Sequence, residues 1–227
     1  MLYIVSTPIG NLSDITVRAS KVLGDCDLIL AEDTRTSKKL LDHLGINTHV
    51  CAYHDFNKEK VTPGLVASLK DGKEIALITD AGTPGVADPG FYLVRAAVAE
   101  GVDVVPVPGA SAVLAALAAS GLPTDRFVFE NFLPNKGTQR RKIFESLKDE
   151  TRTMIFYETP HRIVKTLEDI KATLGDVRVV IARELTKIHE EFLRGSAEEL
   201  LKHFEVNQPK GEMVVLFNVR VKSKSNN

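Results

Sequence analysis

The chain has little cysteine, no excess of charge of either sign and no long hydrophobic segment. Its two cysteines, Cys26 and Cys51, lie far apart with no paired histidines, which argues against a metal site and suits a reducing compartment. The net charge of −1 gives no global basic field for nucleic acid, so any RNA contact must come from a local basic patch. No apolar run reaches membrane-spanning length, and the first residues lack the basic start of a signal peptide. We expect a cytoplasmic protein with neither a metal nor a membrane association.

The familiar phosphate-binding motifs are also missing. No Gly-x-Gly-x-x-Gly follows the first apolar run, and no Gly-x-x-x-x-Gly-Lys-Ser/Thr occurs anywhere. The stretch Asp80-Ala81-Gly82-Thr83 faintly resembles an aspartyl-phosphatase loop, but Gly82 stands where that chemistry needs a second acid. The sequence therefore argues against these nucleotide-binding and phosphatase classes.

The stretch 74–101 organises the rest of the chain. The apolar residues 74–79 predict a buried parallel strand, and residues 91–100 predict a helix. The loop 80–90 between them is rich in glycine, proline and aspartate. Because open α/β sheets bind ligands at the carboxyl ends of their strands, this loop is the first candidate for a ligand site.

Strands and helices alternate through the first half of the chain. Strands are predicted at residues 2–6, 27–31, 48–52, 74–79 and 102–107. Helices are predicted from Ser13 or Asp14 as N-cap, over 37–44 with Gly45 as the closing residue, and over 60–70, 91–100 and 112–120. This alternation indicates βαβ units and a parallel sheet in an N-terminal α/β domain, residues 1–120.

The pattern changes after residues 121–125, which we interpret as a linker. Strands are predicted at 126–132, 152–157, 177–182, 190–194 and 212–219, with helices over 138–147, 161–174 and 197–204. The last strands are less regularly separated by helices, which favours a mixed sheet in a C-terminal α/β domain, residues 126–220. The polar residues 221–227 are predicted to be a disordered tail.

Three loops of unusual composition follow predicted strands, at residues 7–11, 80–90 and 108–111. In a parallel sheet they should meet at one edge and form a single cleft. They offer backbone groups, small residues and few charges, which suits a flat neutral heterocycle and a zwitterion better than a triphosphate. The alternative for each loop by itself is an ordinary turn.

Charged residues of the second half allow two interpretations. Arg183 and Glu184 follow an apolar strand, and they could either serve a site or form an ion pair that braces the domain. The dense basic cluster Lys136, Arg140, Arg141 and Lys142 could grip RNA phosphates or be a solvated face.

With these residues assembled, the chain resembles the bacterial 16S ribosomal RNA cytidine 2′-O-ribose methyltransferases of the tetrapyrrole-methylase superfamily. The resemblance runs from residue 2 to about 219 and is carried by many motifs in order. They are LYIV with TPIGNL (2–12), AEDTR (31–35), DAGTP and DPG (80–90), PGASA (108–112), SGLP (120–123), FLP (132–134), YE with PHR (157–162), RELTK (183–187) and KGE (210–212).

This resemblance implies a class III methyltransferase-like fold, S-adenosylmethionine as methyl donor in a cleft between two α/β domains, a homodimer, and 16S rRNA or the small ribosomal subunit as partner. The residues expected to bind the cofactor are Pro8, Asp80, Ala81, Gly82, Thr83, Asp88, Pro108, Gly109, Ala110, Ser111 and Tyr157. Candidates for assisting the ribose hydroxyl are Glu184, Asp33 and Lys187. Lys136, Arg140 and Arg141 are candidates for RNA contacts, and Arg35, Arg162 and Arg183 are candidates either for phosphate contacts or for bracing the cleft.

The chain departs from this family at a few positions. Asn131 stands where glycine is expected, and Asp55-Phe56 interrupts a His-Asn-Glu-like stretch near His54. The tetrapyrrole-modifying relatives open with a Gly-x-Gly-Pro-Gly-Asp type loop, whereas residues 6–11 here read STPIGN. Two alternatives stay open: a methylase of a tetrapyrrole carbon, and a non-enzymatic nucleotide-binding module in which Glu184 is purely structural.

Overall fold

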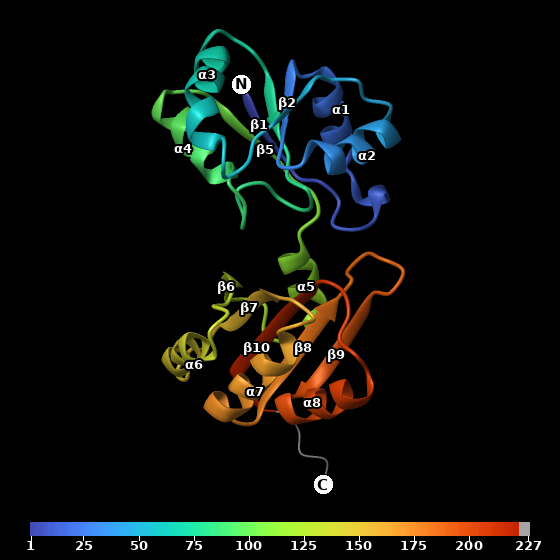
Figure 1. The fold of residues 1–227 in the computed structure, drawn as a ribbon, viewed down its shortest axis with the longest axis vertical. Coiled ribbons are helices and arrows are strands. Elements are labelled where there is room, and N and C mark those ends of the chain that lie inside the picture. The colour runs from blue at the N-terminus through green and yellow to red at the C-terminus, as the bar shows by residue number, and fades with distance from the viewer. Residues whose placement is uncertain (223–227) are drawn as a thin grey trace. The chain divides into compact units, whose positions relative to one another are not determined.

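A computed structural model of the chain describes residues 1–222 and divides the protein into two compact units, which meet in sequence at Ser111 and Ala112. Figure 1 shows an α/β arrangement in each unit. The predicted disorder of residues 223–227 lies outside the described residues. None of the described helices is both long enough and apolar enough to cross a membrane.

The N-terminal unit is built on a five-stranded, all-parallel sheet with the order β3-β2-β4-β1-β5. Its strands are β1 (Leu2–Val5), β2 (Leu28–Ala31), β3 (Val50–Ala52), β4 (Ile75–Leu77) and β5 (Val104–Val107). Its helices are η1 (Leu12–Asp14), α1 (Val17–Asp25), α2 (Thr34–Leu44), α3 (Lys58–Lys70) and α4 (Gly90–Ala99). The predicted parallel sheet is confirmed.

Helices cover both faces of this sheet, with α3 and α4 on one side and α1 and α2 on the other (Figure 1). Successive residues of β1 show the division, since Ile4 packs with Leu93 of α4 while Val5 packs with Leu23 of α1. The short strands are apolar because both of their faces are buried.

The first helix begins later than predicted. Neither Ser13 nor Asp14 is its N-cap, because both belong to the 3-10 turn η1, which Asn11 caps. The helix α1 starts at Val17, and the Thr16 hydroxyl oxygen accepts a hydrogen bond from the Ala19 N–H at 3.0 Å. Gly45 closes α2 as predicted: its φ of 67° is a conformation that glycine adopts without strain.

The C-terminal unit contains a mixed sheet with the order β6-β7-β10-β8-β9. Its strands are β6 (Phe127–Phe132), β7 (Thr153–Glu158), β8 (Val177–Arg183), β9 (Glu191–Ser196) and β10 (Met213–Lys222). The pair β6–β7 is parallel and the other pairs are antiparallel. Its helices are α5 (Ala112–Ser120), α6 (Gly137–Ser146), α7 (Ile163–Leu174) and α8 (Ala197–Val206). The predicted mixed sheet is confirmed, but residues 221 and 222 belong to β10 rather than to a tail.

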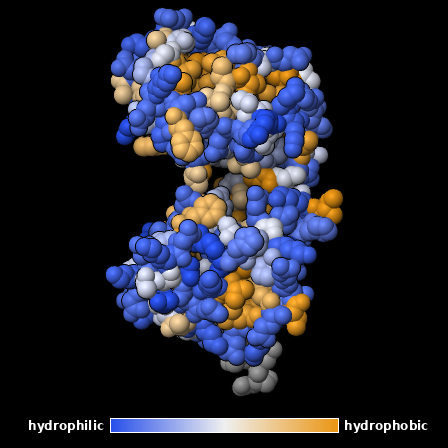
Figure 2. Space-filling view, in the orientation of Figure 1, coloured by the Kyte–Doolittle hydropathy of each residue, from blue (hydrophilic) through white to orange (hydrophobic). Residues whose placement is uncertain are grey.

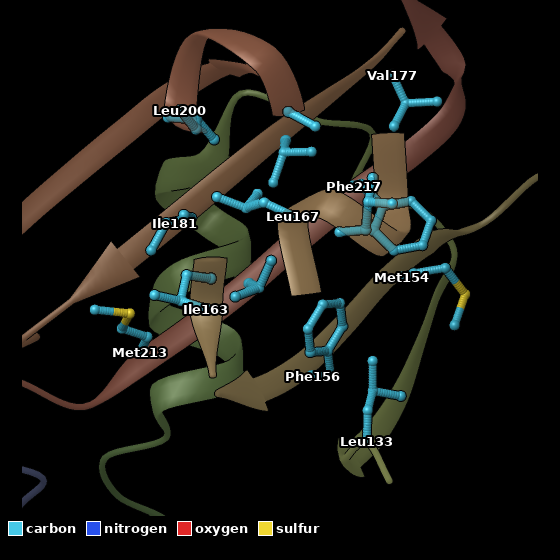
Figure 3. Packing of buried hydrophobic residues seen from close by; sticks show 14 of the residues in the cluster. Leu133, Met154, Phe156, Ile163, Leu167, Val177, Ile181, Leu200, Met213 and Phe217 are labelled. Carbon is cyan, nitrogen blue, oxygen red and sulfur yellow. The ribbon is translucent and has the colours of Figure 1, made fainter. Parts of the chain in front are cut away.

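The core of this unit lies between one face of the sheet and the helices α6, α7 and α8. Figure 3 shows Met154, Phe156, Met213 and Phe217 of the strands facing Ile163 and Leu167 of α7. Three rings, from Phe144, Phe156 and Phe217, pack in tilted and edge-to-face arrangements with centroids 6.0–6.3 Å apart.

The helix α5 belongs to the second unit, although the sequence placed it in the first. Val214 and Leu216 of β10 are buried on the sheet face opposite the aromatic core, and α5 contacts β10, β7 and β8. The apolar residues of α5 therefore cover the second face of this sheet. The boundary moves from residue 120 to Ser111 for that reason.

Candidate functional site

The loops that follow β1 and β4 are joined at the carboxyl edge of the N-terminal sheet. Thr7 and Gly82 form an isolated antiparallel bridge, in which each N–H donates to the other residue's carbonyl oxygen at 2.9 and 3.1 Å. The hydroxyls of Ser6 and Thr83 share a hydrogen bond of 2.9 Å. Because β4, β1 and β5 are neighbours in the sheet, the predicted meeting of the loops at one edge is confirmed.

The turn after β5 lies directly against the end of β1. A Cβ atom at Gly109 would lie 2.9 Å from the Cβ of Ser6, which is closer than carbon atoms pack. Gly82 has a φ of 87°, which residues with a side chain rarely adopt. Glycine at both positions therefore lets the three loops approach one another, with backbone groups at the edge.

Asp88 shapes the long loop after β4. Its Oδ1 accepts hydrogen bonds from the N–H groups of Gly85 and Gly90, both at 2.7 Å, and Gly90 is the first residue of α4. Burial raises the pKa of Asp88. This carboxylate holds the loop against the start of α4, so we interpret Asp88 as a positioning residue.

Asp33 caps α2 at the same edge. Its carboxylate accepts the Arg35 N–H at 2.8 Å and pairs with the Arg35 guanidinium at 2.7 Å. These hydrogen bonds lower the pKa of Asp33 to about 2. A carboxylate with so low a pKa is a weak base, which argues against Asp33 as the group that removes a proton. The Asp33 N–H also donates to Asp80 Oδ1 at 3.2 Å.

Glu32 is a carboxylate of this edge that we did not predict as a site residue. It follows β2 and accepts a hydrogen bond from the Thr79 hydroxyl at 3.1 Å, across to the end of β4. Burial raises the pKa of Glu32, and that of Asp80 in the same way. The sequence does carry a signal that could have identified Glu32 as a site residue, because Glu32 is a polar residue directly after an apolar strand.

Glu184 and Lys187 form a charged cluster with Glu212 in the C-terminal unit. Lys187 Nζ lies 3.0 Å from Glu184 Oε1 and 2.9 Å from Glu212 Oε2. The hydrogen bond from Lys187 lowers the pKa of Glu184. Burial alone would lower the pKa of Lys187, but its hydrogen bonds to Glu212 and Glu184 outweigh burial and raise it. The pair is therefore held in its charged form, which weakens the case for either residue as a base near neutral pH.

One interpretation of the sequence was an ion pair between Arg183 and Glu184. The structure pairs Arg183 with Glu191 instead. Its Nε lies 2.6 Å from Glu191 Oε2, and its guanidinium also donates to the Lys210 carbonyl at 3.3 Å. Glu184 instead has a φ of 50°, a conformation that costs energy for a residue with a side chain. The brace exists, but it connects β8 to β9 and to the chain before β10.

The basic cluster of Lys136, which precedes α6, and Arg140, Arg141 and Lys142 of α6 has members with different environments. The Arg140 side chain is only 4% exposed, and its guanidinium pairs with the buried Asp169 of α7. Arg141 also pairs with Asp169, at 2.8 Å, but its side chain is 48% exposed. Lys136 and Lys142 are exposed. Arg140 is therefore a structural residue, which corrects its prediction as an RNA contact.

Arg162 also has partners within its own unit. It lies 3.2 Å from the buried carboxylate of Glu158 and donates to the Leu133 carbonyl at 2.5 Å. The Thr166 hydroxyl donates to the other Glu158 oxygen at 2.7 Å. This arrangement connects β7, α7 and the end of β6, and it leaves Arg162 bracing the unit rather than presenting a free cation.

Tyr157 lies between two aromatic rings of β6. Its ring centroid is 5.0 Å from that of Phe129 and 5.4 Å from that of Phe132, and burial raises the pKa of its hydroxyl.

Asn131, where glycine is expected, has a φ of 53°. Asparagine tolerates this left-handed conformation better than most residues, which accounts for the substitution.

Among the described residues, no group of three or more histidine, cysteine, aspartate and glutamate side chains could hold a metal ion. Cys26 is buried and Cys51 is half-buried, and both are free thiols.

Solved structures of class III methyltransferases share this fold. A cobalt precorrin-4 methyltransferase of cobalamin biosynthesis aligns with a TM-score of 0.69 and 20% identity, covering 96% of this chain and 94% of that one. Diphthine synthase aligns with a TM-score of 0.74 and 18% identity, covering 96% and 89%. The fold is therefore that of a class III methyltransferase.

Sequence comparison gives the family. The model of the tetrapyrrole (corrin/porphyrin) methylases matches residues 1–201. Proteins named ribosomal RNA small subunit methyltransferase I are similar: that of Escherichia coli O157:H7 is 51% identical over 95% of this chain and 76% of its own length. That of Thermotoga maritima is 46% identical over 96% and 97%. The chain belongs to the tetrapyrrole methylase family, and it is an S-adenosylmethionine-dependent methyltransferase.

The residues at the edge of the N-terminal sheet fit this cofactor. Gly82 and Gly109 leave backbone groups free of side chains, which lets a flat heterocycle such as adenine approach the edge closely. The residues of this unit that would hold it are those of the three loops: Pro8, Asp80, Ala81, Gly82, Thr83, Pro108, Gly109, Ala110 and Ser111. When bound, S-adenosylmethionine supplies a methyl group made electrophilic by its sulfonium.

Replacement of Asp88 should weaken cofactor binding. Asp88→Ala removes the acceptor of the Gly85 and Gly90 N–H groups, and an unsatisfied buried donor costs about 1–3 kcal/mol. If the loop must be ordered for binding, affinity for S-adenosylmethionine falls by about 5- to 150-fold. Isothermal titration calorimetry measures this directly. Asp88→Asn keeps an oxygen acceptor and should lose much less; equal affinity of Asp88→Ala and the wild type would contradict the role.

Proposed function

We propose that the enzyme methylates the 2′-oxygen of a cytidine ribose in 16S rRNA of the small ribosomal subunit. The observation that carries this proposal is the similarity to proteins named ribosomal RNA small subunit methyltransferase I, at 46–51% identity over nearly the whole chain. The loop STPIGN at residues 6–11 supports it, because it differs from the opening loop of the tetrapyrrole-modifying relatives. We further propose that the enzyme is a cytoplasmic homodimer.

Positioning of the two reactants supplies most of the rate enhancement in this proposal. Holding reactants in line is worth roughly 7–11 kcal/mol at best, whereas a general base gives about 10²–10⁴-fold, or roughly 3–5 kcal/mol. The low pKa of Asp33 and of Glu184, and the raised pKa of Lys187, leave these three residues poor bases. Their charges are better suited to orienting the ribose hydroxyl than to removing its proton.

Exposed cations are the remaining candidates for RNA phosphates. Arg35, Lys136, Arg141 and Lys142 are exposed, although Arg35 and Arg141 also pair with carboxylates. Arg140, Arg162 and Arg183 are less exposed, and each has a carboxylate partner within its unit. Phosphate contacts position a nucleic acid without reading its sequence. The target nucleotide must be unpaired or splayed out for its hydroxyl to reach the donor methyl group.

Tritiated S-adenosylmethionine tests the proposal. The purified protein is incubated with small ribosomal subunits from cells that lack this enzyme, and in parallel with naked 16S rRNA, and the label is mapped to nucleotide and atom. Label on a ribose oxygen of one cytidine is the expected result. Absence of transfer to either substrate, with cofactor binding intact, would overturn the proposal and direct attention to porphyrinoid substrates.

A further inference from the structure

Aromatic rings and cations gather where α3 and α4 begin. The group consists of Phe56, Lys58, Phe91, Tyr92 and Arg95, and we call it the ring–cation surface. Phe56 is 99% exposed and Phe91 is 62% exposed. Figure 2 shows that hydrophilic residues cover most of the visible face of the N-terminal unit, with hydrophobic residues at the surface in separate patches.

The cations of this surface lie against its rings. Arg95 Cζ is 5.7 Å from the centre of the Phe91 ring and 5.4 Å from that of Tyr92, and Lys58 Nζ is 5.9 Å from the Tyr92 ring. These are cation–π distances. Rings alternating with cations match a chain of flat bases joined by phosphates better than they match an apolar protein partner, whose binding would strip water from both cations.

The loop that carries Phe56 is pinned while the ring itself points into solvent. Asn57 accepts the His54 N–H at 2.9 Å and donates to the Ala52 carbonyl at 2.8 Å, and Lys58 pairs with Asp55 at 2.6 Å. Phe56 touches the His54 ring only edge-on, with centroids 6.1 Å apart. Exposing a large apolar ring to water is unfavourable, and here no packing contact offsets the cost. A binding role explains why an ordered loop holds the ring in solvent.

The ring–cation surface adjoins the candidate site of the N-terminal unit. α3 follows β3 and α4 follows β4, so both helices begin at the carboxyl edge of the sheet, and α4 begins two residues after Asp88. The loop that carries Phe56 follows β3, which is the sheet neighbour of β2, and Lys58 at the end of this loop lies 5.9 Å from the Tyr92 ring of α4. The Phe56 loop therefore lies beside the loops that follow β2 and β4.

We propose that the ring–cation surface stacks the unpaired bases that flank the target nucleotide. The inference rests on the proposed RNA substrate and names the part of the N-terminal unit that holds it. Proteins that bind single-stranded RNA stack bases on aromatic side chains and on arginine guanidinium planes. Phe56 and Phe91 offer ring faces, and Arg95 offers a guanidinium that already lies on two rings.

Binding of RNA to Phe56→Ala and to Phe91→Ala tests the inference. The probes are a fluorescein-labelled unpaired oligonucleotide of small-subunit rRNA sequence and a fully paired RNA duplex. Each variant should bind the unpaired probe about 5- to 150-fold more weakly than the wild type and the duplex equally well. Phe56→Trp should retain affinity and Phe56→Leu should lose it, because leucine keeps the apolar character without a flat face. Val98→Ala, at a site of α4 that is 61% exposed but outside the surface, is the matched control.

Two further measurements separate this inference from its alternatives. Light scattering reports the mass of each variant: loss of self-association in Phe56→Ala, with RNA affinity unchanged, would assign the surface to contacts between copies and overturn the inference. Methyl transfer by the wild type is measured in parallel. Transfer with unchanged RNA affinity in both variants overturns the stacking role and leaves the proposed function standing. Weakened binding of the unpaired probe without any transfer supports the stacking role and counts against the proposed function.

Discussion

Arg140→Ala is expected to lower the free energy of unfolding by about 3–5 kcal/mol, because it leaves the charge of Asp169 buried without its main partner. The Arg140 side chain is 4% exposed and the Asp169 side chain 8%, so water cannot replace the lost guanidinium. Arg140 also donates to the carbonyl oxygens of Pro134 and Lys165 and so connects α6 with α7. Urea denaturation followed by far-UV circular dichroism measures the change.

The neighbouring arginine gives a matched control. Arg141→Ala removes a pair with the same carboxylate, but its 48% exposed side chain limits the expected loss to about 1 kcal/mol or less. Arg140→Met combined with Asp169→Leu replaces the buried pair with apolar side chains of similar size, and such replacements are often neutral. Wild-type stability of Arg140→Ala together with weakened RNA binding would show that Arg140 contacts RNA after all.

The basic cluster shows that a run of charged residues in a sequence does not reveal which of them is buried. Lys136, Arg140, Arg141 and Lys142 look equivalent as a run of charges, yet only Arg140 is buried. Helical spacing separates them, since Arg140 lies four residues before the fully buried Phe144 and so shares its face of α6. The acidic partner lies on α7, 29 residues further along the chain, and no local pattern identifies it.

The N-terminal sheet was predictable because buried parallel strands are short apolar runs and their ligand loops follow them directly. The sequence did not predict the bridge between Thr7 and Gly82, because it depends on β1 and β4 being neighbours in the sheet. The helix α5 was misplaced for the opposite reason: it is alanine-rich and apolar all round, so no polar face indicates which sheet it covers. The partners of Glu184 are set by chain reversals between β8, β9 and β10, which the sequence does not specify.

Gly211→Ala is expected to reduce methyl transfer by about 100-fold, since misplacing a positioned group by 1 Å can cost that much. Gly211 precedes β10 and has a φ of 79°. A Cβ at this position would lie 2.5 Å from both Cδ and Oε1 of Glu184, so the carboxylate must move. That movement breaks its hydrogen bonds with Lys187 Nζ and with the Glu212 N–H, both at 3.0 Å. Tritium transfer to small subunits under single-turnover conditions measures the loss.

Gly121→Ala separates the displaced carboxylate from simple backbone strain. Gly121 has nearly the same φ, 77°, but nothing lies within 4 Å of where its Cβ would be. Both substitutions place a side chain in the left-handed region, at a cost of roughly 1–2 kcal/mol in stability. Only Gly211→Ala displaces Glu184, so only that variant should lose activity, and its excess instability should disappear when Glu184→Ala removes the clashing carboxylate. Equal loss of activity in the two glycine variants would mean that the Glu184–Lys187 arrangement is a brace without a part in the reaction.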